Sequence, residues 1–142
     1  MRLVVVAVGK IREPSLRAVA NEYLGRLQHY VRCDEVEVRS GDAFARAIPE
    51  DALLVALEVG GESFSSAAFA RALERWGSQG KGVVAFLIGG ADGIPAELSQ
   101  RAKVKFSLSS LTLPHRLARV VLFEQLYRAM TILRGEPYAR ED

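Results

Sequence analysis

The sequence is poor in the residues that staple small domains covalently or through metals. It has 142 residues but only one cysteine, Cys33, and two histidines, His29 and His115. A lone cysteine excludes an internal disulfide and a zinc cluster built on paired cysteines, and it suits a reducing compartment. The two histidines lie far apart, and neither has a metal-ligating partner at a regular spacing. We therefore expect a protein without a structural metal.

Long hydrophobic runs are also missing. The longest, at residues 3–8, has six residues, whereas a membrane-spanning helix needs about 20. Together with Met1 and Arg2 this run is too short for a secretory signal, so we expect a first strand and a cytoplasmic protein without a membrane partner. Apolar residues make up 49% and charged residues 25% of the chain, as in ordinary globular proteins. The length predicts a single domain over residues 1–142.

Three common site motifs are absent. No Gly-x-Gly-x-x-Gly follows the first strand, and neither Gly-x-x-x-x-Gly-Lys-Ser/Thr nor Gly-x-Ser-x-Gly occurs anywhere. These absences disfavour a dinucleotide-binding fold, a P-loop NTPase and an α/β-hydrolase. The glycine turns that remain have few titratable groups nearby, which fits a site that binds a small molecule through backbone groups.

The formal net charge of +2 is weak evidence for a polyanionic partner. The charges are unevenly spread, because both ends of the chain are basic while residues 34–78 carry four basic against nine acidic residues. Fifteen of the 19 cations are arginine, the side chain suited to bidentate contact with phosphate. A GC-rich coding sequence would produce the same bias.

The chain alternates between segments with strand character and segments with helix character. Apolar and alternating runs predict strands at residues 3–8, 35–39, 52–59, 83–88 and 104–108. Spacing and end signals predict helices after Pro14, from Asp42 to Pro49, after Ser65 or Ser66, over 94–102, and from Pro114 or His115 to Leu133. This order predicts the α/β class, with a mostly parallel sheet of about five strands and helices on both faces.

Ligands of parallel α/β sheets bind beyond the carboxyl ends of strands, and three such ends stand out. Two are glycine turns at residues 59–61 and 88–90, where a missing Cβ lets the backbone approach a ligand, although each would also serve as a tight structural turn. The third, residues 108–114, combines hydroxyls with leucines. It predicts a slot for a flat apolar ring with polar edges, with a packed connection as the alternative.

The final helix is apolar around most of its circumference. At 100° per residue its apolar side chains surround the axis: Leu117, Val120, Val121, Leu122, Phe123, Leu126, Met130, Ile132 and Leu133. A surface helix keeps one polar face, so this helix must be covered on more than one side. Either a second copy of the chain or the protein's own core supplies that cover, and we expect a homodimer.

Several short motifs follow one another in the second half of the chain. Leu-Ile-Gly-Gly at residues 87–90 precedes Leu-Ser-Ser-Leu-Thr-Leu-Pro-His at 108–115. Arg119, Glu-Gln-Leu-Tyr-Arg-Ala at 124–129 and Arg-Gly-Glu-Pro-Tyr at 134–138 come next. In this order they resemble the RlmH family of ribosomal RNA large-subunit methyltransferases, within the SPOUT superfamily. The resemblance covers essentially the whole chain.

This resemblance implies a fold and an activity. The fold is a SPOUT domain with a C-terminal deep trefoil knot, assembled as a homodimer, with S-adenosylmethionine as the methyl donor. The implied reaction is N3-methylation of pseudouridine 1915 in helix 69 of 23S rRNA, on the assembled 70S ribosome. A SPOUT methyltransferase acting on another RNA such as tRNA, and a non-catalytic nucleotide-binding module, are the alternatives.

The resemblance also implies positions for the site. The cofactor cradle falls on the three strand ends, at Leu57, Gly89, Gly90, Leu108, Ser109, Ser110, Leu111, Thr112 and Leu113. His115, Tyr138 and Arg140 are the candidate catalytic residues, for positioning the substrate or handling its proton. The start of a helix favours a neutral imidazole at His115. Family members usually carry a histidine where this chain has Ala139, so this chain has no histidine base at that position.

Basic side chains are candidates for contact with RNA. The first set lies on the final helix and the second near the first helix: Arg116, Arg119, Arg128 and Arg134, then Lys10, Arg12, Arg17 and Arg26. Pairing within the protein is the alternative, as the i,i+4 spacing of Glu124 and Arg128 indicates.

Overall fold

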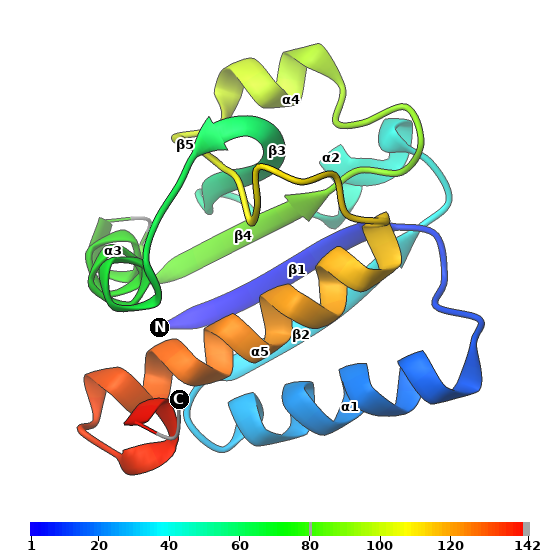
Figure 1. The fold of residues 1–142 in the computed structure, drawn as a ribbon. Helices are drawn as coiled ribbons and strands as arrows, with labels where there is room; N and C mark the ends of the chain where they lie inside the picture. The colour runs from blue at the N-terminus through cyan, green and yellow to red at the C-terminus, as the bar shows by residue number, and fades with distance from the viewer. Residues whose placement is uncertain (80, 141–142) are drawn as a thin grey trace.

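A computed structural model describes residues 1–79 and 81–140 and shows a wholly parallel five-stranded sheet between two layers of helices (Figure 1). The strands β1 (Arg2–Val8), β2 (Arg32–Val38), β3 (Leu53–Glu62), β4 (Val83–Ile88) and β5 (Val104–Phe106) lie in the order β2-β1-β4-β3-β5. The helices are α1 (Pro14–Gln28), α2 (Phe44–Ala47), α3 (Ser66–Gln79), α4 (Ala96–Arg101) and α5 (His115–Leu133), with 3-10 turns η1 (Gly41–Ala43) and η2 (Pro137–Arg140). The predicted fold class is confirmed. In the described ranges, none of the helices has the length and hydropathy of a bilayer-crossing segment.

The central strands are apolar on both faces because helices cover both faces of the sheet. Leu3 and Val5 of β1 belong to the core beneath α1, α3 and α5. Val4, between them, points to the opposite face, where it packs in a smaller core with Phe44 of α2 and Leu98 of α4. The predicted placement of helices on both faces is therefore correct, although the second layer is built from two short helices.

Strand β3 runs further than the sequence predicts. It continues through its two glycines to Glu62, because Phe106 of β5 pairs first with Leu57 and then, across a bulge, with Glu62. A Cβ on Gly61 would lie 2.6 Å from the Lys105 carbonyl carbon, so only glycine allows the two backbones to lie this close.

Strand β5, in turn, ends at Phe106 rather than at residue 108, and the next residues belong to a loop. Asp42 does not cap a helix, because it lies inside η1, which begins after Ser40.

Helix α5 is covered mainly by its own chain. It packs against both α1 and α3 on one face of the sheet (Figure 1), and Leu122, Phe123 and Leu126 are completely buried. Of the two covers considered for this helix, the protein's own core supplies most. Leu117, 39% exposed, and Leu111 in the preceding loop, 72% exposed, are two large apolar side chains that stay exposed near the start of α5.

Arg119 of α5 is wholly buried and lies at the centre of an ion-pair network. Its guanidinium donates to the carboxylates of Glu35 (3.0 Å) and Glu37 on β2, and to the carbonyl of Gly9 after β1 (3.0 Å). Arg17 of α1 pairs with the same two carboxylates. Two cations and two anions thus offset the cost of desolvation and join α1, α5 and β2. Because Arg119 is inaccessible, the prediction that it contacts RNA is wrong.

Replacing Arg119 by methionine is expected to lower the free energy of unfolding by about 3 kcal/mol, because among the described residues Glu35 and Glu37 keep only Arg17 as an ion-pair partner. Urea unfolding followed by circular dichroism measures the loss, with Arg75→Met on the exposed face of α3 as the matched control. Adding Glu37→Gln to the Arg119→Met variant should recover part of the loss. An unchanged urea midpoint in Arg119→Met would show that the network does not hold the helices.

Candidate functional site

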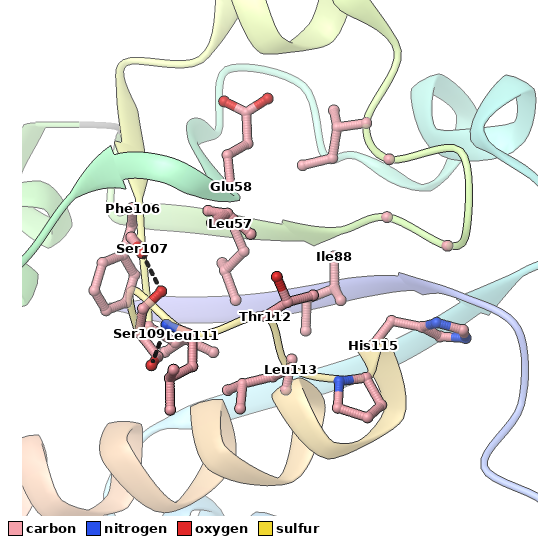
Figure 2. Close-up of a pocket in the computed structure, with 18 of the residues that line it drawn as sticks. Leu57, Glu58, Ile88, Phe106, Ser107, Ser109, Leu111, Thr112, Leu113 and His115 are labelled. Carbon is pink, nitrogen blue, oxygen red and sulfur yellow. Dashed lines mark hydrogen bonds between the residues drawn. The ribbon is translucent and has the colours of Figure 1, made fainter.

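A pocket lies at the carboxyl ends of β3, β4 and β5, where the three predicted strand ends converge (Figure 2). Its volume is about 560 Å³, within the roughly 300–1,000 Å³ usual for small-molecule sites. Most of the predicted cradle lines it: Leu57, Gly89, Gly90, Leu108, Ser109, Leu111, Thr112 and Leu113. Ser110 is exposed and does not line the pocket. The structure thus brings these residues together, while their binding of a cofactor stays a prediction.

Two serine hydroxyls shape the loop that follows β5. Ser107 donates its hydroxyl to the carbonyl of Ser109 (2.8 Å), and the amide of Leu111 donates to the hydroxyl of Ser109 (2.9 Å), as Figure 2 shows. The tight turn between Ser109 and Leu111 leaves Ser110 on the outside, which explains its absence from the pocket wall. The serine hydroxyls therefore serve the shape of the loop, and the leucines supply the wall.

The turn after β4 requires glycine for its own packing. A Cβ on Gly89 would lie 2.4 Å from the carbonyl carbon of Gly93 and 2.8 Å from the amide nitrogen of Ile94. Gly93 has a φ of +73° and donates its amide to the carbonyl of Gly90 at 3.0 Å. The structural alternative for this turn is thus sufficient to explain Gly89. The same close packing presents bare backbone to the pocket.

Glu58 is a pocket residue that lies outside the predicted cradle. Among the described residues that line the pocket, it is the one with a formal charge at neutral pH. Its carboxylate accepts a hydrogen bond from Ser99 of α4 at 2.8 Å, and Figure 2 shows it directed away from the leucines. A described wall with one anion and no cation suits a cationic ligand. Glu58 directly follows Leu57 near the end of a predicted strand, and this position in the sequence could have identified it as a pocket residue.

Further lining residues were also missed: Ile94, Phe106, Ser107 and Ala118. The end of β5 was predicted two residues too late, so that Ser107, the first residue of the loop, was taken for part of the strand. Across residues 1–79 and 81–140, no group of three or more His, Cys, Asp or Glu side chains is arranged to hold a metal.

His115, the first residue of α5, lines the pocket with a neutral imidazole. Burial lowers the pKa of His115 below its ordinary 6.5, and the neighbouring guanidinium groups of Arg116 and Arg119 lower that pKa further. The lowered pKa has the direction that the predicted neutral form requires, with burial as its first cause. Figure 2 shows the ring directed away from the leucines, toward the loop between β1 and α1. A Cβ built on Gly9 of that loop would lie 4.0 Å from Nε2.

Tyr138 and Arg140 lie in η2, after the far end of α5, and neither lines the pocket of its own chain (Figure 1). Tyr138 donates its hydroxyl to the carboxylate of Glu124 at 2.8 Å. Glu124 follows His115 by nine helical residues, a rise of about 14 Å along the helix axis. The structure therefore does not bring the three candidate catalytic residues together within one chain.

The surroundings of Tyr138 fix its protonation state. Its ring lies 4.5 Å from that of Tyr127, between ring centroids, and 4.9 Å from the guanidinium carbon of Arg128. Burial raises the pKa of Tyr138 well above its ordinary value, and its hydrogen bond to Glu124 raises that pKa further. The phenol stays protonated at neutral pH, so Tyr138 donates hydrogen bonds and does not act as a base in this conformation.

The fold and the pocket define a class of protein: a parallel α/β domain that binds a small molecule where the carboxyl ends of its strands meet. A family model described as "Predicted SPOUT methyltransferase" matches residues 1–139. The chain belongs to this SPOUT methyltransferase family, as its sequence motifs indicate.

Curated relatives match nearly end to end. Ribosomal RNA large subunit methyltransferase H of Sorangium cellulosum is 59% identical over 145 residues, covering 98% of this chain and 99% of the relative. The protein of the same name from Anaeromyxobacter sp. is 46% identical over 152 residues, covering 97% and 99%. A Legionella pneumophila protein, solved as a methyltransferase with bound SAM, shares the fold at a TM-score of 0.51 and 10% identity, over 91% of this chain and 66% of that chain.

Gly89→Ala is expected to destabilise the protein by roughly 1–3 kcal/mol, because the new methyl group must push the 89–94 turn aside. Gly60→Ala is the matched control, since a Cβ there meets nothing within 4 Å. Thermal unfolding of both variants measures the difference. Equal melting temperatures would show that the turn yields freely and that its close packing does not restrict the pocket.

Proposed function

We propose that this protein transfers a methyl group from S-adenosylmethionine to N3 of pseudouridine 1915, in helix 69 of 23S rRNA, on the assembled 70S ribosome. One observation carries the proposal: a pocket of suitable size lies at the strand ends of a chain that matches ribosomal RNA large subunit methyltransferases H along its whole length. A ribosomal substrate implies a cytoplasmic enzyme. The deep trefoil knot remains part of the proposal.

The pocket suits the donor in size and charge. S-adenosylmethionine supplies a methyl group that is already activated on a sulfonium centre, so the protein has to bind it, orient it and exclude water. Leu57, Leu108 and Leu113 give apolar wall for a flat ring, and the turn at Gly89 gives bare backbone. Glu58 is the lining charge and has the sign that attracts a cation.

The target nitrogen of pseudouridine is an imide N–H, which must lose its proton as it attacks the methyl group. His115 is a neutral imidazole on the pocket wall, and its lowered pKa keeps it able to accept that proton at neutral pH. The imidazole ring of His115 faces the loop between β1 and α1, so the target pseudouridine would enter the pocket from that side. Tyr138, which stays protonated, would donate its hydroxyl to the substrate in place of Glu124.

Tyr138 and Arg140 serve this reaction only in the pocket of a second copy. The tail that carries them is fastened to Glu124, away from the pocket of its own chain. Leu111, which lines the pocket, and Leu117, near the start of α5, are exposed apolar side chains that a second copy would cover. The proposal therefore includes a homodimer in which the tail of one protomer completes the site of the other.

Methyl transfer to ribosomes tests the reaction. Tritiated S-adenosylmethionine is incubated with the protein and with 70S ribosomes that lack the modification, with tRNA as the parallel substrate, and the modified base is mapped. Label at N3 of the helix 69 pseudouridine is the expected result. Label in tRNA alone would favour another RNA substrate, and failure to bind the donor in calorimetry would favour a non-catalytic module.

Complementary variants test the shared site. Thr112→Trp places an indole at the mouth of the pocket, whereas Tyr138→Phe with Arg140→Ala alters only the tail and should keep donor binding. Each variant alone should methylate ribosomes slowly. A heterodimer of the two should regain activity, because its one open pocket meets an intact tail. A heterodimer that remains as slow as its parents would refute the shared site.

A further inference from the structure

Three cations form a ledge beside the pocket. Lys10 and Arg12 are exposed in the loop between β1 and α1, and Arg116 is the second residue of α5. The Nε of Arg116 donates to the carbonyl of Lys10 at 2.8 Å, which joins two segments far apart in sequence. Figure 1 shows this loop next to the start of α5. We call Lys10, Arg12 and Arg116 the basic ledge.

Within the described part of the chain, the basic ledge is free of ion pairs, unlike most other cations considered for RNA contact. No described carboxylate lies within 4 Å of its three charged groups. By contrast, Arg119 is buried against Glu35 and Glu37, and other candidates pair with acids: Arg17 with the same two glutamates, Arg26 with Glu22, and Arg128 with Glu124. Even with Glu13 in the same loop, the ledge keeps a net positive charge.

Hydrogen bonds to α5 and β2 hold the loop that contains Lys10 and Arg12 in place. The carbonyl of Gly9 accepts from Arg119 at 3.0 Å, and the amide of Gly9 donates to the carbonyl of Val38 at 2.8 Å. The amide of Ile11 donates to Glu37 at 3.4 Å, and its side chain is buried. Lys10 and Arg12 therefore flank an anchored residue, and a ligand that binds them orders little additional backbone.

The ledge also lies next to His115, at one side of the pocket. His115 directs its imidazole toward Gly9, the residue before Lys10, and the described residues of the pocket wall include no cation. We propose that the basic ledge binds backbone phosphates of the RNA next to the target nucleotide, and so brings the base to the His115 side of the pocket. This inference rests on the proposed function and names the contact that delivers its substrate. Phosphate contacts of this kind position an RNA without reading its sequence.

Charge-removing variants with a matched control test the ledge. Lys10→Ala with Arg12→Ala removes two exposed cations, and Arg116→Gln removes the third while its amide can still donate to the Lys10 carbonyl. Arg75→Ala with Lys103→Ala removes two exposed cations from α3 and from the residue before β5, which are outside the pocket wall. Ribosome affinity by filter binding, KM and kcat for methyl transfer, and donor affinity are each measured at several salt concentrations.

The Lys10/Arg12 variant should bind ribosomes roughly tenfold more weakly, and its log–log salt slope should fall by about 1 for each phosphate that the variant no longer neutralises. KM should rise in step, while kcat and donor affinity stay at the wild-type values. The Arg75/Lys103 control should match the wild type. Equal affinity and salt slope in the ledge and control variants would overturn the inference.

The binding readout separates this inference from the proposed function. If the wild-type protein methylates ribosomes and the ledge variants bind ribosomes equally well, the proposed function stands and the inference about the ledge fails. A wild-type protein that binds ribosomes through the ledge but transfers no methyl group would leave the ledge standing without the proposed chemistry. Exposed positions carry the Lys10/Arg12 substitutions, so loss of folding does not confuse either result.

Discussion

The buried guanidinium of Arg119 is the interaction on which the rest of this structure depends. A charge without solvent exposure must be matched by partners in fixed positions, and here the partners come from β2 and from the turn after β1, while Arg17 of α1 shares the two carboxylates of β2. Matching them fixes the start of α5 relative to the sheet. The start of α5 carries His115 and ends the loop that lines the pocket. The geometry of the pocket is therefore set partly by an ion-pair network that lies outside it.

Local patterns in the sequence were sufficient for the class of fold but not for its arrangement. Burial on both faces leaves continuous apolar runs in the central strands, and the edge strand β2 alternates instead, so the strands were predictable to within a few residues. The order β2-β1-β4-β3-β5 was not predictable, because an apolar run shows that a strand is buried but not which strands lie next to it in the sheet. For the same reason, the apolar circumference of α5 did not distinguish a second copy from the helices α1 and α3 of its own chain.

The parts of the candidate site that are formed by turns and loops of the backbone were predictable from the sequence. Glycine turns and a leucine loop at three strand ends do meet in one pocket. The prediction that Ser110 lines the pocket failed, because a hydrogen bond from the amide of Leu111 to the hydroxyl of Ser109 turns Ser110 outward. The prediction that Arg119 contacts RNA failed, because its partner Glu35 is 84 positions away in the sequence and no sequence pattern links such residues. The raised pKa of Tyr138 likewise depends on burial and on the hydrogen bond to Glu124, which exist only after the tail folds back.

The tryptophan and the tyrosines lie in two different places in the fold. Trp76 is the chain's one tryptophan, and it packs in the main core against Phe64, Phe69 and Phe86. The four tyrosines gather instead where α1, the second half of α5 and η2 meet: Tyr23, Tyr30, Tyr127 and Tyr138. Indole fluorescence thus reports on the interior of the sheet layer, and tyrosine absorbance reports on the docking of the C-terminal segment. The molecule carries two independent optical signals without any label.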